Sequence, residues 1–170
     1  MLEEFKELAN TARACHFRWG GAKSGMTRPI PTTRSAYPWS LPIQTRWLDN
    51  DVYGHMNNTV HYTLFDTAAN AWLIQSGLLD PLNGATIGVM VSSGCTYHSE
   101  MGYPDIIDVG VRVSRIGGSS VTYEFGCFRN GSDVSCADGT FTHVYVDKAE
   151  RRPQALTDAW RTKLAEILAV

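Results

Sequence analysis

The stretch Asp49-Asn50-Asp51-Val52-Tyr53-Gly54-His55-Met56-Asn57-Asn58 gathers acids, a histidine, a glycine and asparagines into one short, turn-rich segment. The residues that follow, Thr59–Ser76, have a helical pattern in which apolar side chains recur one turn apart. Asn57 or Asn58 can cap the start of this helix, and Gly77 suits its left-handed end. Because apolar residues cover much of the helix surface, we expect it to be buried on more than one side. Those apolar pairs are Leu64/Phe65, Ala68/Ala69 and Trp72/Leu73.

One strand is predicted before this segment, over Leu41–Trp47, and four are predicted after the helix, where the apolar period changes to two. Short, turn-rich connections between the later strands predict an antiparallel meander. A second helical pattern covers Leu156–Leu168. The expected class is α+β, with an antiparallel sheet of about five strands wrapped around one long central helix, plus a C-terminal helix. The four later strand candidates are Thr86–Tyr97, Ile106–Arg115, Ser120–Arg129 and Val134–Val146.

The length of 170 residues predicts a single domain. We expect residues 39–170 to form it. Residues 1–38 have the composition of an irregular, basic N-terminal extension, in which Gly and Pro follow a short helix predicted over Glu3–Ala14. This extension is either a solvated segment lying over the domain or an arm that helps to hold an anionic ligand.

The composition excludes several classes of protein. A formal charge of −2 is too balanced for a protein that coats nucleic acid. No apolar run approaches the ~20 residues of a membrane-spanning helix, and Glu3, Glu4 and Glu7 argue against a signal peptide. We expect a cytoplasmic protein with reduced cysteines, no nucleic-acid partner and no membrane insertion. The histidines and cysteines lack metal-ligand spacing, so no metal site is predicted.

The segment 49–58 has the chemistry needed to transfer an acyl group to water. A helix N-terminus presents free backbone N–H groups that can polarise a carbonyl. A carboxylate that loops back toward the same point can attack that carbonyl or deprotonate a water molecule. Asp49 and Asp51 can equally well cap turns, which is the structural alternative. A calcium loop is excluded, because Tyr53 and Val60 stand where ligand oxygens are required.

The pattern Asp51-x-x-Gly54-His55-Met56-Asn57-Asn58, followed by Phe65-Asp66, resembles that of acyl-CoA thioesterases of the 4-hydroxybenzoyl-CoA thioesterase type. The likeness extends over about Leu41–Asp147 and includes the step Tyr103-Pro104-Asp105 and the turn Gly117-Gly118-Ser119-Ser120. Those enzymes have the hotdog fold, which is the same sheet-around-helix arrangement that the periodicity predicts. The resemblance implies hydrolysis of an acyl thioester to a free acid and coenzyme A.

The resemblance also implies catalytic roles for five residues. Asp51 matches the family's carboxylate, which serves as a nucleophile or as a general base. Asn58 matches the position whose backbone N–H faces the thioester carbonyl. Gly54 lets the loop turn closely, and His55 and Asn57 match polar positions that either take part in catalysis or order the loop.

Substrate contacts are implied at five further positions. His61 stands where the family most often has tyrosine, at a place that lines the acyl pocket or supports the loop. Phe65 is expected to line the same pocket. Arg115 is a candidate partner for the phosphates of coenzyme A, because arginine is well suited to phosphate. The other candidates of this group are Arg112, Arg129, Arg151 and Arg152. Ser119 and Ser120 are expected beside it as substrate-binding residues.

No cofactor is expected, because coenzyme A is part of the substrate. Hotdog domains usually pair edge to edge and share the active site, which implies a homodimer or a dimer of dimers. Two other functions stay open. The thioester could be carried by an acyl carrier protein instead of coenzyme A, or the protein could bind acyl-CoA without hydrolysing it. A hydratase on the same fold would need a different Asp/His pairing in the helix, which this sequence lacks.

Overall fold

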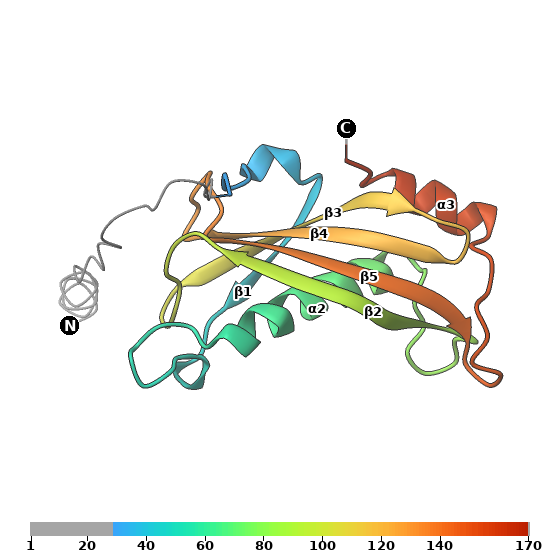
Figure 1. The fold of residues 1–170 in the computed structure, drawn as a ribbon, viewed down its shortest axis with the longest axis horizontal. Coiled ribbons are helices and arrows are strands. Elements are labelled where there is room, and N and C mark those ends of the chain that lie inside the picture. Colours follow the sequence, from blue (N-terminus) through green and yellow to red (C-terminus); the bar gives the residue numbers. More distant parts are fainter. Residues whose placement is uncertain (1–28, 170) are drawn as a thin grey trace, which may run out of the picture.

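The structure, a computed structural model, describes residues 29–169, in which one long helix lies against a five-stranded antiparallel sheet (Figure 1). This arrangement confirms the predicted α+β class. The predicted helix over Glu3–Ala14, and with it most of the expected extension, falls outside the described residues. The elements are η1 (Arg34–Ala36), β1 (Trp39–Gln44), η2 (Trp47–Asp49), α2 (Asn58–Gln75), β2 (Thr86–Tyr97), β3 (Ile106–Ile116), β4 (Ser120–Arg129), β5 (Ala137–Asp147) and α3 (Asp158–Ala165).

The strands lie in the order β1-β3-β4-β5-β2, so the predicted four-strand meander is wrong for its first member. Strands β3, β4 and β5 do follow one another as a meander, but β2 pairs with β5 along its whole length and β1 takes the place beside β3. The reason is the path of residues 98–105. His98 N donates to Cys136 O, and Asp105 O accepts from Thr45 N, so this connection crosses the end of the sheet from β5 to β1.

Helix α2 forms where the periodicity predicts, because both of its ends are set locally. The side chain of Asn57 accepts a hydrogen bond from the N–H of Thr59, and Gly77 has the left-handed φ of +73°. The buried side of the helix centres on Phe65, which stacks on Phe125 of β4 with ring centroids 5.0 Å apart. Gly139 of β5 leaves room for the Phe65 ring, since a Cβ there would overlap it.

The segment before β1 packs on the other face of the sheet. Gly110 of β3 and Gly126 of β4 lie opposite each other, and the ring of Tyr37 occupies the space above them. A Cβ at Gly110 would come within 2.6 Å of this ring, so only glycine fits there. The guanidinium of Arg112 lies 5.0 Å from the centroid of the same ring. Burial raises the pKa of Tyr37 to about 12.

The strand and helix boundaries differ from the predictions mainly where a local turn takes over. The strand predicted over Leu41–Trp47 is shifted to Trp39–Gln44, because Trp47 begins the η2 turn. The strand predicted from Val134 begins at Ala137, since the residues before it bond to the segment at Thr32 and Thr33. The predicted C-terminal helix shortens to α3, whose N-cap is Thr157. Among the described residues, no helix is long and apolar enough to cross a membrane.

Candidate active site

The loop between η2 and α2 is closed like a small hairpin. The N–H of Asn57 donates to Asp49 O at its base (2.9 Å), Asn50 and Met56 form a bridge, and the N–H of Asp51 donates to His55 O (2.7 Å). Gly54 turns the chain with a φ of +80°, which a side chain would strain. These bonds fold the segment that carries Asp51 back onto the residues that lead directly into the first turn of α2.

Asp51 is half-buried, and its two carboxylate oxygens differ in their surroundings. Oδ1 accepts hydrogen bonds from the N–H groups of Tyr53 (2.8 Å) and His55 (3.2 Å). Oδ2 has no hydrogen bond or ion pair to any residue within 29–169. One oxygen therefore fixes the carboxylate to the loop, as the turn-capping alternative requires, while the other is left for a ligand or a water molecule.

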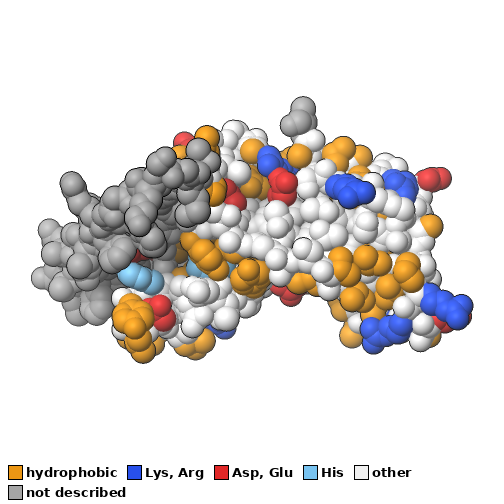
Figure 2. Space-filling model, viewed as in Figure 1, with side chains coloured by type: hydrophobic (Ala, Val, Ile, Leu, Met, Phe, Trp, Pro, Cys, Tyr) orange, Lys and Arg blue, Asp and Glu red, His pale blue; other side chains and the backbone are white. Residues whose placement is uncertain are grey.

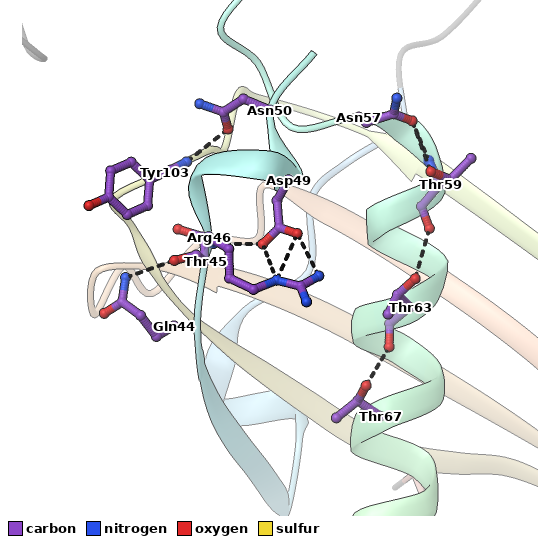
Figure 3. A network of polar contacts seen from close by, with 10 residues as sticks. All are labelled: Gln44, Thr45, Arg46, Asp49, Asn50, Asn57, Thr59, Thr63, Thr67 and Tyr103. Carbon is purple, nitrogen blue, oxygen red and sulfur yellow. Dashed lines mark hydrogen bonds and ion pairs between the residues drawn. The ribbon is translucent and has the colours of Figure 1, made fainter.

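The first turn of α2 offers a free donor close to that loop. Asn57 caps the helix: its Oδ1 accepts from the N–H of Thr59 (3.0 Å) and from its hydroxyl (2.9 Å), as Figure 3 shows. The N–H of Asn58 has no acceptor in the described part of the chain. An exposed amide of this kind, at the positive end of a helix, is suited to a carbonyl or an oxyanion.

Asp49, the other acid of the motif, has a structural role. It is 3% exposed, and both of its oxygens bond to Arg46, at 2.7 Å from Nη2 and 2.7 Å from the backbone N–H (Figure 3). Burial alone would raise the pKa of Asp49, but the hydrogen bonds and the charge of Arg46 outweigh it and hold that pKa below its ordinary value. The Arg46–Asp49 pair thus anchors the base of the loop.

Residues 100–103 support the loop from the side, a contribution that the sequence analysis missed. The N–H of Met56 donates to Met101 O (2.8 Å), and the N–H of Tyr103 donates to Asn50 Oδ1 (2.9 Å). His55 Nε2 lies 3.4 Å from Oε1 of Glu100, with both side chains well exposed. No local pattern links these residues to the loop. The Tyr103-Pro104-Asp105 step was the one nearby signal in the sequence.

The two aromatic positions expected at the acyl group are both buried. His61 packs edge-on against Tyr97 with centroids 4.9 Å apart, and its Nδ1 lies 3.3 Å from Asn57 O. Burial lowers the pKa of His61, and the carbonyls of Asn57 and Asn58 offset only part of this effect. Phe65 is fully buried among core rings, so within one chain it has no exposed surface for a ligand.

Arg115, Ser119 and Ser120 lie at the opposite end of the sheet from the loop. Arg115 is near the end of β3, Ser119 belongs to the turn that leads into β4, and Ser120 begins β4. This turn is held from α3, because Arg161 Nη2 donates to Gly117 O at 2.9 Å. Within one chain the expected coenzyme-binding residues are therefore not brought together with Asp51.

No group of three or more His, Cys, Asp or Glu side chains in residues 29–169 is arranged to hold a metal ion. Cys95, Cys127 and Cys136 are free thiols. Cys15 lies outside the described residues.

Comparison with known proteins finds a matching family and similar solved structures. The family model of the thioesterase-like superfamily matches residues 45–166, which include the loop and the whole sheet after β1. The PA5185 protein from Pseudomonas aeruginosa strain PAO1 is 45% identical to this chain; the match covers 83% of this chain and 98% of that one, with a TM-score of 0.79.

Two further solved structures are similar. The PA2801 protein from Pseudomonas aeruginosa is 28% identical, with coverage of 75% of this chain and 96% of that one and a TM-score of 0.68. A 1,4-dihydroxy-2-naphthoyl-CoA thioesterase from Synechocystis is 17% identical, with coverage of 74% and 94% and a TM-score of 0.66, and this likeness concerns the fold alone. The hotdog fold and the expected family are thereby confirmed: the chain belongs to the thioesterase-like superfamily.

Proposed function

We propose that this protein is an acyl-CoA thioesterase in which Asp51 and the start of α2 act on the thioester from two sides. The observation that supports it is that a carboxylate oxygen and a backbone N–H, both without a hydrogen-bond partner in the described chain, lie on the same closed loop and at the helix start that follows it. Asp51 Oδ2 has no partner in the described chain, and neither does the N–H of Asn58. A carboxylate oxygen and an amide donor placed at the same loop are what hydrolysis of an activated ester requires.

In the proposed reaction, the N–H of Asn58 binds the thioester oxygen and stabilises the negative charge that develops on it. Asp51 Oδ2 either takes a proton from the attacking water or attacks the carbonyl carbon itself. In the second case a mixed anhydride forms and water then cleaves it. On both routes the carbon–sulfur bond breaks, the thiolate of coenzyme A leaves and takes up a proton, and no cofactor is used.

The proposal includes a dimer built through the free edge of β2. This strand exposes Val89, Met90, Val91 and Tyr97, and in Figure 2 hydrophobic side chains follow its course across this face. An exposed, apolar edge strand is a template for pairing with another chain. A two-fold axis beside β2 would bring the Arg115 end of one sheet toward the Asp51 end of its partner, which would complete a site that one chain leaves divided.

The test compares the wild type with Asp51→Asn in the hydrolysis of acyl-CoA esters that carry short, long and aromatic acyl groups. Hydrolysis is measured by the free thiol that it releases. We expect Asp51→Asn to lower kcat by at least about a hundredfold, since an amide is neither a base nor a nucleophile. Hydrolysis by Asp51→Asn at the wild-type rate would refute the assignment.

Asp80→Asn is the matched control. Asp80 also uses Oδ1 to accept two backbone N–H groups of its own turn, from Leu82 and Asn83, at 3.0 Å each. If Asp51 only caps its turn, the two variants will behave alike. Binding of acyl-CoA without hydrolysis of any ester in the panel would instead favour a non-catalytic binding module. Hydrolysis of acyl esters on an acyl carrier protein, but not of acyl-CoA, would show that the substrate is carried by that protein and not by coenzyme A.

A further inference from the structure

A histidine stands on the inner face of the sheet, among aromatic side chains that form the core. His143 of β5 is 6% exposed and lies between Phe141 and Tyr145, the neighbouring inward-pointing residues of its strand. Its ring centroid is 5.6 Å from that of Tyr123 and 6.3 Å from that of Tyr145. We refer to His143, Tyr123 and Tyr145 as the His143 cluster.

The polar groups of the His143 cluster are not all satisfied by the protein. His143 Nδ1 is buried and has no hydrogen-bond partner in residues 29–169. The hydroxyls of Tyr123 and Tyr145 bond to each other at 2.7 Å, so one of their two hydrogens is used, and the other finds no acceptor among the same residues. Buried polar atoms in folded proteins are almost always paired, so this cluster needs an explanation.

The imidazole is suited to a neutral polar partner. Burial lowers the pKa of His143, and the negative charge of Asp66 on α2 offsets this only in part. A neutral imidazole offers either an N–H or a lone pair at Nδ1, according to its tautomer. A hydroxyl group both donates and accepts, so it can satisfy Nδ1 in either tautomer and can also accept the spare tyrosine hydrogen.

The cluster lies beside a part of the sheet that α2 leaves uncovered. Gly88 of β2, directly opposite Tyr145, is exposed, and a Cβ there would lie 3.4 Å from His143 Nδ1 and 3.3 Å from Tyr145 Cε1. Met90, opposite His143, is 42% exposed. Within one chain the inner side of this edge strand is therefore open next to the unpaired nitrogen, and the absent side chain of Gly88 keeps it so.

The distance from the proposed reaction centre sets the length of a ligand that could reach the cluster. Phe65 of α2 packs against Phe141, whose ring centroid lies 6.1 Å from that of His143. Phe65 is seven residues beyond Asn58, which corresponds to about 10.5 Å along a helix, and His143 is two residues further along β5 than Phe141. An extended chain advances about 1.2 Å per bond, so about ten bonds are needed. An acetyl group, or an acyl group made of a single ring, ends well short of this point.

We propose that the His143 cluster binds a hydroxyl group near the far end of a medium-chain acyl group, so that the preferred substrates are ω-hydroxylated acyl thioesters. This inference rests on the proposed function, because it takes the α2 start as the position of the thioester. It assigns His143 as a specificity-determining residue that touches the acyl group far from the bond that breaks.

The experiment compares hydrolysis of decanoyl-CoA, 10-hydroxydecanoyl-CoA and 3-hydroxydecanoyl-CoA by the wild type and by His143→Phe. One added hydrogen bond to a neutral group predicts about a fivefold to tenfold higher kcat/KM for the 10-hydroxy ester over the other two in the wild type. His143→Phe should abolish that preference, and it should melt at the same or a higher temperature, because it removes an unpaired buried atom.

Gly88→Ala provides a second variant in case His143→Phe does not fold, since it places a methyl group beside Nδ1 and keeps the imidazole. It should also reduce the preference for the 10-hydroxy ester. Equal kcat/KM for the three esters in the wild type, or a preference that survives both substitutions, would overturn the inference while leaving thioester hydrolysis intact. If no ester is hydrolysed, the proposed function fails, and the relative affinities of the three esters, measured by equilibrium dialysis, still decide the inference: equal or absent binding rejects it.

Discussion

Two aspartates separated by one residue have very different surroundings in this protein. Asp49 is buried, and both of its oxygens are used by Arg46. Asp51 is half-buried and keeps one oxygen without a partner in the described chain. The sequence pattern alone could not assign these roles, because either acid can cap a turn. The closed geometry of the loop separates a structural carboxylate from one that is available for chemistry.

Asp49→Asn should destabilise the fold by about 2 kcal/mol, because it removes charge-assisted hydrogen bonds of a buried group. Since the folded pKa of Asp49 is below its ordinary value, the contribution to stability is present above about pH 4 and is lost as the pH falls through the folded pKa. Urea unfolding at pH 7 and pH 3 measures both effects. The exposed Asp133→Asn is the control, and equal stability of the two variants at pH 7 would contradict this role.

At the scale of elements, α2 shows how local signals and packing combine. An N-cap at Asn57 or Asn58 and a left-handed Gly77 are expected from residue types alone, and the structure selects Asn57. Its exposed side carries Thr59, Thr63 and Thr67, whose hydroxyls turn back to the helix: Thr67 Oγ1 donates to Thr63 O at 2.7 Å (Figure 3). The hydroxyl groups of these threonines therefore find acceptors within the helix and its N-cap.

The Tyr37 ring fills the space over Gly110 of β3 and Gly126 of β4, and this contact can be tested by substitution. Gly110→Ala would place a methyl group within 2.6 Å of the Tyr37 ring, which must then leave its position over the sheet. We expect a loss of about 1–3 kcal/mol in the free energy of unfolding, as for overpacked sites, together with faster proteolysis before β1. Gly118→Ala, where a Cβ meets nothing within 4 Å, is the control. Similar melting temperatures for the two variants would show that Tyr37 is not held as described.

For the whole molecule, the main open feature is the edge of β2, which pairs with β5 on one side and with no strand of the described chain on the other. The strand interrupts its register with β5 between Met90 and Ser92, and Val91 at this irregularity is 59% exposed. A second group of exposed apolar residues, which includes Trp47 and Val52, lies on η2 and on the loop that carries Asp51. In Figure 2 hydrophobic side chains are visible at this end of the molecule as well. The proposed dimer would cover the β2 edge and bring the two ends of the sheet together.

Replacing Val89 and Val91 together by lysine should abolish that dimer, because charged lysines on an edge strand oppose pairing with a second strand. Sedimentation should then show the mass of one chain, and thioesterase activity should fall with the loss of the shared site. Leu82→Lys, at a residue 84% exposed in the loop before β2, is the control and should stay dimeric and active. A double variant that remains dimeric would place the interface elsewhere.

The fold class, the extent of α2 and most strand boundaries could be predicted from the sequence, because they depend on neighbours close along the chain. The cap at Asn57, the turn at Gly54 and the period-two pattern of Ser120–Arg129 are all local properties. The family resemblance rested on the same kind of local signal, the spacing of Asp51, Gly54 and Asn58.

Only the tertiary structure decided which distant residues meet. It placed β2 beside β5, set Glu100 next to His55, put Tyr37 over Gly110 and enclosed His143 between rings of two strands. These contacts depend on how strands and loops cross in space, and no short sequence window contains both partners. The sequence alone therefore indicates the reaction, while the selectivity that we infer for its substrate depends on contacts that arise when the sheet closes around the helix.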